Sequence, residues 1–256
     1  MFFATFHEWW SLKAEARAVS LTAMFTALVC AFTISIQLYI PATRGYFNVG
    51  EVMVYTGALV GGPFVGAFAG GVGSMLADVA TGFAYYAPGT LVIKGLEGLI
   101  VGWLARRRPF KTVRAWRGLS TAIGVAVGLA LLSIAPIYVG EASLTLSLLG
   151  LWGQEVQLVI QPWVWYLAAA LTTTLIAYAG FRVDPDVGWV ALSILLGGGM
   201  MVLGYFIYEQ VFLGVAAIVE VPFNVAQCLV GLMASIPLYK AIQAAAPSLI
   251  EQGTLK

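Results

Sequence analysis

Ionisable side chains interrupt long apolar stretches of this sequence, and they are the groups most able to do chemistry. Such a group costs at least about 2.5 kcal/mol in the middle of a membrane, so each one needs a partner or a function. The set is Glu51, Asp78, Lys94, Glu97, Glu209 and Glu220. Carboxylates and an ammonium group can pair with one another or hydrogen-bond a polar solute.

Asp78 and Lys94 are predicted to lie at a similar depth. Asp78 comes four residues before the expected end of one apolar segment, and Lys94 comes five residues after the expected start of the next. A helix rises 1.5 Å per residue, so both lie about 6–8 Å below the same surface. We expect them to be neighbours, either as a structural ion pair or as part of a ligand site.

Further polar and aromatic side chains are predicted at this same level. Asn48 and Glu51 begin the second segment, while Glu97 lies deeper on the face that carries Lys94. Aromatic residues crowd the adjoining loops, and stacking surfaces with a few oriented polar groups are what a solute-binding cavity needs. The candidate binding residues are Tyr46, Phe47, Asn48, Glu51, Asp78, Tyr85, Tyr86, Lys94, Glu97, Tyr205, Glu209, Asn224 and Gln227.

The composition indicates that these residues belong to a membrane protein. Of 256 residues, 61% are hydrophobic and only 10% are charged, against roughly 25% charged in a soluble domain. We predict an all-α polytopic helical bundle that forms one integral membrane domain over residues 1–256, with the lipid bilayer around it. About eight hydrophobic segments are expected, near 16–40, 49–60, 63–81, 89–105, 119–138, 162–181, 188–211 and 218–243.

Basic residues predict the orientation, because cytoplasmic loops are rich in Lys and Arg. An even number of spans puts 11 of the 13 basic residues on one side, with Arg44 and Lys94 as the exceptions. We therefore expect a multi-pass protein of the plasma membrane with both termini in the cytoplasm. The external loops are then 41–48, 82–88, 139–161 and 212–217.

Several kinds of chemistry have no motif in this sequence. It lacks the G-x-x-x-x-G-K-[ST] phosphate loop, and its one histidine, His7, precedes the apolar core. We expect no catalytic residues, no metal site and no cofactor, and no nucleic acid among the partners.

Small residues recur at helical spacing in two segments. Ala23, Ala27 and Ala31 follow one another at intervals of four, as do Gly62, Gly66 and Gly70. Such stripes let helix backbones approach closely. The glycines are predicted to pack within the chain, whereas the alanines either do the same or form a docking surface for a partner.

Three stretches resemble the substrate-binding S component of energy-coupling-factor (ECF) transporters, in the riboflavin-type branch. They are GYFNVGEVMVYTGALVGGPFVGAFAGGVGSMLADVATGFAYYAPGTLVIKGLEGLIVG at 45–102, MMVLGYFIYE at 200–209 and EVPFNVAQCLVG at 220–231. The resemblance implies a six-helix core, here residues 1–106 and 188–246. Residues 107–187 depart from the family pattern and are expected to form an inserted hairpin of two membrane helices.

The resemblance also implies a function. An S component captures a small vitamin or precursor, such as a flavin, a pyrimidine or a similar planar heterocycle, from outside the cell. It delivers the vitamin with a separate coupling membrane subunit and two ATPase subunits, so the chain itself is not expected to be an enzyme. Ala23, Ala27 and Ala31 would dock on the coupling subunit.

Two other functions stay open from the residues alone. One is an integral membrane enzyme that acts on a lipid-linked substrate with Asp78, Glu51 and Glu97 around a metal. The other is a channel or secondary transporter that works alone.

Overall fold

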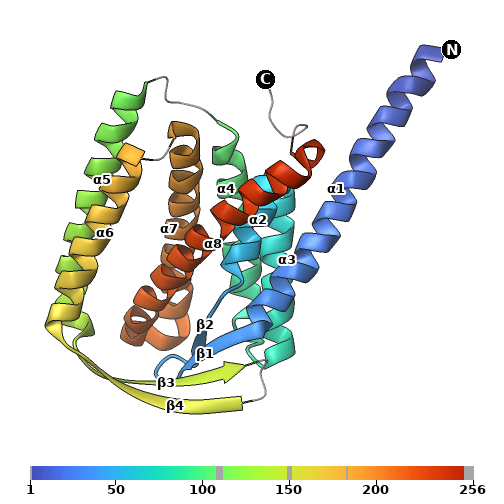
Figure 1. Ribbon diagram of the computed structural model, residues 1–256. Coiled ribbons are helices and arrows are strands. Elements are labelled where there is room, and N and C mark those ends of the chain that lie inside the picture. The colour runs from blue at the N-terminus through green and yellow to red at the C-terminus, as the bar shows by residue number, and fades with distance from the viewer. Residues whose placement is uncertain (1, 108–111, 149–151, 183, 251–256) are drawn as a thin grey trace.

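The computed structural model describes residues 2–107, 112–148, 152–182 and 184–250, and most of them are helical (Figure 1). The α-helices are α1 (Phe2–Ser35), α2 (Glu51–Gly61), α3 (Pro63–Thr81), α4 (Ala87–Ala105), α5 (Val113–Ile134), α6 (Pro162–Arg182), α7 (Pro185–Leu213) and α8 (Val221–Ala245). Short 3-10 helices follow at η1 (Ala135–Tyr138), η2 (Gly214–Glu220) and η3 (Pro247–Leu249).

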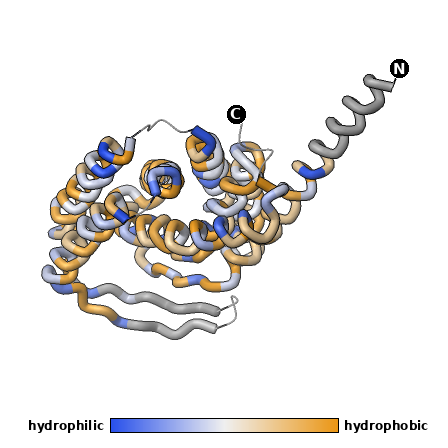
Figure 2. The backbone as a smooth tube through the Cα atoms, turned by 45° about the horizontal axis from the view of Figure 1, so that its top comes forward, coloured by the Kyte–Doolittle hydropathy of each residue, from blue (hydrophilic) through white to orange (hydrophobic). Residues whose placement is uncertain are grey.

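The described part of the chain contains six segments long and apolar enough to cross a membrane. They are Ala16–Ser35, Pro63–Thr81, Ala87–Ala105, Val113–Ser133, Pro162–Arg182 and Pro185–Ala245, the last of which includes α7, η2 and α8. The prediction of a multi-pass, helical membrane protein is therefore confirmed, although the described residues contain six candidate spans where about eight hydrophobic segments were expected. Figure 2 shows the apolar colouring that runs along these helices.

Helix α2 is too short to span a bilayer and lies instead inside the bundle. Every residue from 51 to 60 is buried, so this helix is surrounded by protein rather than lipid. It turns into α3 at Gly62, whose φ of 91° suits glycine and few other residues. Pro63 then starts α3 at a position where its missing N–H costs nothing.

Glycines bring α3 and α4 together. A Cβ added at Gly98 would meet the backbone of Gly66, and one added at Gly66 would lie 2.6 Å from both Gly98 O and Ala58 Cβ. A Cβ added at Gly70 would lie 2.7 Å from Lys94 O. The predicted packing of the glycine stripe within the chain is confirmed, and it fixes the two helices that carry Asp78 and Lys94.

We expect Gly98→Val to lower the free energy of unfolding by about 1–3 kcal/mol, because the added atoms meet backbone that cannot move aside. Gly199 on α7 is the matched control, since nothing lies within 4 Å of a Cβ built there. Gly199→Ala should raise stability by about 0.5–1 kcal/mol. Thermal unfolding of both variants in detergent measures the difference, and equal stability would contradict the close packing of α3 on α4.

A four-stranded antiparallel sheet covers one end of the bundle (Figure 1). Its strands are β1 (Ile36–Ile40), β2 (Gly45–Asn48), β3 (Gly140–Leu148) and β4 (Trp152–Ile160), in the order β2-β1-β3-β4. The ranges 41–48 and 139–161, expected as external loops, contain three of these strands. Alternating apolar and polar residues in 143–148 suit a strand, and they pair with β1 in a register that sets Leu38 opposite Leu146.

The sheet and the two chain ends lie at opposite ends of the bundle. In Figure 1 the start of α1 and the end of α8 lie away from the sheet, together with the end of α4 and the start of α5. Arg106, Arg114 and Lys240 lie near those ends of α4, α5 and α8, and Arg182 ends α6 on the same side of the bundle (Figure 1). Arg108, Lys111 and Lys256, which also entered the orientation argument, lie outside the described residues.

Helices α5 and α6 pack chiefly against each other and touch the rest of the bundle mainly at α7 (Figure 1). The Thr173 hydroxyl of α6 donates a hydrogen bond to Gly124 O of α5 over 3.1 Å. These two helices thus form a hairpin at the side of the remaining helices, and β3 and β4 connect them.

Candidate functional site

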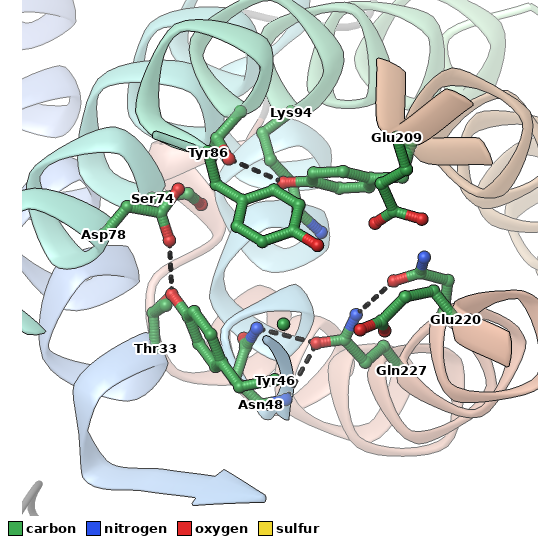
Figure 3. A pocket seen from close by; sticks show the side chains of 14 residues that line it. Thr33, Tyr46, Asn48, Ser74, Asp78, Tyr86, Lys94, Glu209, Glu220 and Gln227 are labelled. Carbon is green, nitrogen blue, oxygen red and sulfur yellow. Dashed lines mark hydrogen bonds between the residues drawn. The ribbon is translucent and has the colours of Figure 1, made fainter. Parts of the chain in front are cut away.

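A polar pocket lies at the sheet end of the bundle, between β2 and the ends of α3, α4, α7 and α8 (Figure 3). As it stands, the side chains leave a cavity of about 30 Å³, which is room for a water molecule or two. Its lining consists of Thr33, Gly45, Tyr46, Asn48, Ser74, Asp78, Tyr86, Thr90, Lys94, Tyr205, Glu209, Glu220, Asn224 and Gln227.

Lys94 forms ion pairs at the base of this pocket. Its Nζ bonds Glu51 Oε1 and lies 3.3 Å from Glu97 Oε2, and all three side chains are almost fully buried. Tyr55 OH donates to Glu97 Oε1 over 2.6 Å. This arrangement holds one positive charge between two negative ones, which makes each of them tolerable in an apolar interior.

Of the two alternatives for Asp78 and Lys94, the structural ion pair is not the one that forms. Both residues line the pocket, as their depth predicted, but the charge partners of Lys94 are the glutamates of α2 and α4. Asp78 Oδ1 instead accepts a hydrogen bond from the hydroxyl of Tyr46. Helical rise gave the depth correctly, whereas the partner depended on how the buried helix α2 packs.

Tyr46 connects the sheet to α3. Burial raises the pKa of its phenol well above the usual range, and the nearby Asp78 carboxylate raises it further. The hydroxyl therefore keeps its proton and acts as the donor to Asp78. The other oxygen of Asp78, Oδ2, has no hydrogen-bond partner among the described residues.

Amide side chains tie α8 to β2. Gln227 Oε1 accepts from Asn48 N over 2.8 Å and from Asn48 Nδ2 over 2.6 Å. Gln227 Nε2 donates to Asn224 Oδ1 over 2.9 Å, and Asn48 Oδ1 accepts from Gly50 N over 2.8 Å. The predicted convergence of Asn48, Asn224 and Gln227 is thus seen in the structure.

Tyrosine rings close the pocket on the side of α4 and α7. Tyr205 OH donates to Thr90 Oγ1 over 3.0 Å, and the Tyr205 ring lies 5.7 Å from Lys94 Nζ. Tyr86 packs edge-on against Tyr205 with ring centroids 6.3 Å apart. Burial raises the pKa of the Tyr86 phenol, so this hydroxyl also stays neutral.

Not every candidate residue reaches the pocket. Phe47 pairs with Leu38 across the β-hairpin, and Tyr85 lies at the outer surface, where it is 44% exposed. Glu51 and Glu97 lie behind Lys94 rather than in the lining.

The candidate list also missed lining residues. These are Thr33, Ser74 and Thr90, which lie within apolar helices. Their side chains carry no charge, so the search for ionisable residues in apolar segments did not find them. Glu220 was recognised as an ionisable group in an apolar segment but was left out of the candidate site. It lines the pocket and accepts a hydrogen bond from Thr43.

The alanine stripe of α1 faces away from the bundle. Ala23, Ala27 and Ala31 are all exposed, whereas Phe25 and Val29 of the same helix are buried in the core. The described part of the chain therefore leaves this row of small side chains uncovered.

Two comparisons with known proteins bear on this geometry. A family model described as "ECF-type riboflavin transporter, S component" matches residues 13–160. The match covers α1 to α4 with β2 and the Lys94 ion pairs, and it extends into residues 107–160, which we had assigned to a departure from the family pattern.

A curated relative, "Uncharacterized protein in gap 3'region" from Pyrococcus woesei, is 53% identical over 74 residues. The alignment covers 29% of this chain and 49% of the relative, so the chain spans about half the length of the curated protein it matches.

Proposed function

Because this chain belongs to the S components of ECF-type riboflavin transporters, we propose that it is the substrate-binding membrane subunit of an ECF-type importer. The observation that carries the proposal is the buried polar pocket at the sheet end. Polar side chains from β2, α3, α4, α7 and α8 converge there within an otherwise apolar bundle. Polar groups buried in membrane helices mark solute pathways and binding sites.

The pocket offers the two kinds of contact that a small heterocycle needs. Tyr46, Tyr86 and Tyr205 provide aromatic surfaces, and Asn48, Asn224 and Gln227 provide amide donors and acceptors. We propose that these groups bind a vitamin or a vitamin precursor, with Asp78, Lys94 and Glu209 as its charged contacts.

Binding of such a ligand requires the pocket to open. Ligand sites commonly enclose about 300–1,000 Å³, whereas the cavity here is about 30 Å³. We propose that the sheet moves to open the pocket. Its strand β2 is held over the pocket by side-chain hydrogen bonds, Tyr46 to Asp78 and Asn48 to Gln227. We propose that these bonds break or rearrange when the substrate enters.

The charge distribution supports an orientation with both termini in the cytoplasm of a plasma-membrane protein. Helix ends that carry Arg106, Arg114, Arg182 and Lys240 lie opposite the sheet (Figure 1), and basic residues favour the cytoplasmic side. The pocket would then face outward. The exposed alanine stripe of α1 would dock on a coupling membrane subunit that works with two ATPase subunits.

The hairpin of α5 and α6 supports a division of the single membrane domain. We propose that residues 1–106 and 188–246 form the six-helix core and that residues 107–187 are an addition at its side. Their contacts support this, because α5 and α6 pack mainly on each other.

We expect the purified full chain to bind a vitamin-like heterocycle, and cells to accumulate that compound only when the coupling subunit and ATPases are present. Mass spectrometry of co-purifying small molecules and tryptophan fluorescence titration give the binding. ATP-dependent uptake into vesicles gives the transport. Uptake by the chain alone would indicate a channel or secondary transporter, and turnover of a lipid-linked substrate would indicate an enzyme.

A further inference from the structure

The lining of the pocket has more acidic side chains than basic ones. Asp78, Glu209 and Glu220 line it together with one ammonium group, that of Lys94. This ammonium is already shared between two further glutamates behind the lining. No positive side chain among the pocket residues is left over for the three lining carboxylates.

Two of these carboxylates each have an oxygen without a donor. Within the described chain, Asp78 Oδ2 and Glu209 Oε2 are buried and accept no hydrogen bond, and the two residues are only 3% and 2% exposed. The Tyr86 hydroxyl lies close to Glu209 and is its nearest donor among the described residues. Buried polar atoms in native proteins almost always have a partner, so these atoms indicate groups that a ligand would satisfy.

The geometry directs these groups at the pocket. Figure 3 shows the Glu209 carboxylate pointing into the space that Glu220 and Gln227 face from the opposite side. Asp78 lies across the pocket, where Tyr46 occupies only one of its oxygens. These oxygens of Asp78 and Glu209 thus border one volume.

Aromatic rings border the same volume. Tyr46, Tyr86 and Tyr205 all belong to the lining. The faces of aromatic rings attract cations, and such rings recur in sites for organic ammonium groups. Rings and carboxylates together fit an organic cation, because a bare metal ion would need several oxygen ligands gathered at one point.

We propose that the solute is an organic cation, a small heterocycle or amine with a positive charge, and that Glu209 and Asp78 are its counter-ions. The inference deepens the proposed function and rests on it. A neutral flavin would bring no positive charge to these two carboxyl groups, and a buried carboxylate without such a charge is costly.

The first experiment compares ligands of different charge on the full-length protein in detergent. The probes are thiamine, which has a permanent positive charge, riboflavin, which is neutral, and the pair pyridoxamine and pyridoxine. Pyridoxamine carries a protonated aminomethyl group where pyridoxine carries a hydroxymethyl group. We expect a cationic probe to bind at least about tenfold more tightly than its neutral counterpart by calorimetry.

Tight binding of riboflavin with no preference for either cationic probe would overturn the inference and leave the proposed function standing. If no probe binds, the inference also fails. ATP-dependent uptake with the partner subunits then decides separately whether the proposed function fails with it.

The second experiment removes one negative charge without changing the shape of the side chain. Glu209→Gln should weaken binding of the preferred cation by about tenfold to a hundredfold, the effect of a hydrogen bond between charged groups. It should not lower the melting temperature of the ligand-free protein, because glutamine has almost the shape of glutamate and Glu209 has no ion-pair partner among the described residues. Glu141→Gln, at an exposed position on β3, is the matched control and should change neither quantity.

Asp78→Asn provides an independent variant in case Glu209→Gln does not fold. Unchanged preference for the cation in whichever variants fold would show that these carboxylates are not its counter-ions and would overturn the inference.

Discussion

Lys94→Met is expected to lower the free energy of unfolding by about 3–5 kcal/mol, the usual cost of removing one partner from a buried ion pair. Lys94 is 2% exposed and holds Glu51 and Glu97, which are 1% and 0% exposed. Without the ammonium group, two carboxylates would face each other in an apolar interior. Thermal and denaturant unfolding of the variant in detergent measures the loss, and ligand binding should fall with it because Lys94 also lines the pocket.

The matched control neutralises the whole cluster. Lys94→Met combined with Glu51→Gln and Glu97→Gln removes the charges together, so most of the lost stability should return. If the triple variant folds but does not bind the ligand, Lys94 has two roles: it pairs with Glu51 and Glu97, and it also contacts the ligand. A loss below about 1 kcal/mol in the single variant, as at a surface ion pair, would contradict the buried arrangement.

The sequence predicted depth within the membrane better than it predicted partners. Asn48, Asp78, Lys94 and Gln227 converge on one pocket because helical rise is fixed and polar residues are rare in apolar segments. The partner of Lys94 was misassigned, since depth along a helix says nothing about its rotation or about the packing of α2. Depth alone therefore brought Asp78 close to Lys94 but could not pair them.

Long-range pairing was the other feature that the sequence did not reveal. Residues 36–39 pair with 145–148 across more than a hundred residues of chain. The short alternating pattern in 143–148 could equally belong to a loop. Tyr46 reaches Asp78 only because the sheet carries β2 under the end of α3, so this contact was missed with the sheet. The family resemblance, by contrast, rested on whole motifs and is confirmed by the match over residues 13–160.

The exposed alanines of α1 allow binding and coupling to be separated. Phe25 and Val29 fill the core from one face of the helix, while Ala23 and Ala27 lie on its outer face. A surface that only touched lipid would gain nothing from small residues, because large apolar side chains suit lipid equally well. A helix partner does require them, since small side chains permit close backbone contact. We therefore assign this stripe to the coupling subunit as a prediction.

Ala23→Trp and Ala27→Trp are expected to abolish ATP-dependent uptake, at least about a hundredfold below wild type, while substrate affinity stays within about twofold. The bulky ring would hold the two helices apart, and an interface loses several kcal/mol when its packing is disrupted. Uptake into vesicles and fluorescence titration on the same preparations measure the two quantities. Leu175→Trp, at a 63% exposed position of α6 on the far side of the bundle, is the control and should transport normally. Normal transport by both alanine variants would leave α1 facing lipid, and loss of binding would mean that the stripe packs within the subunit.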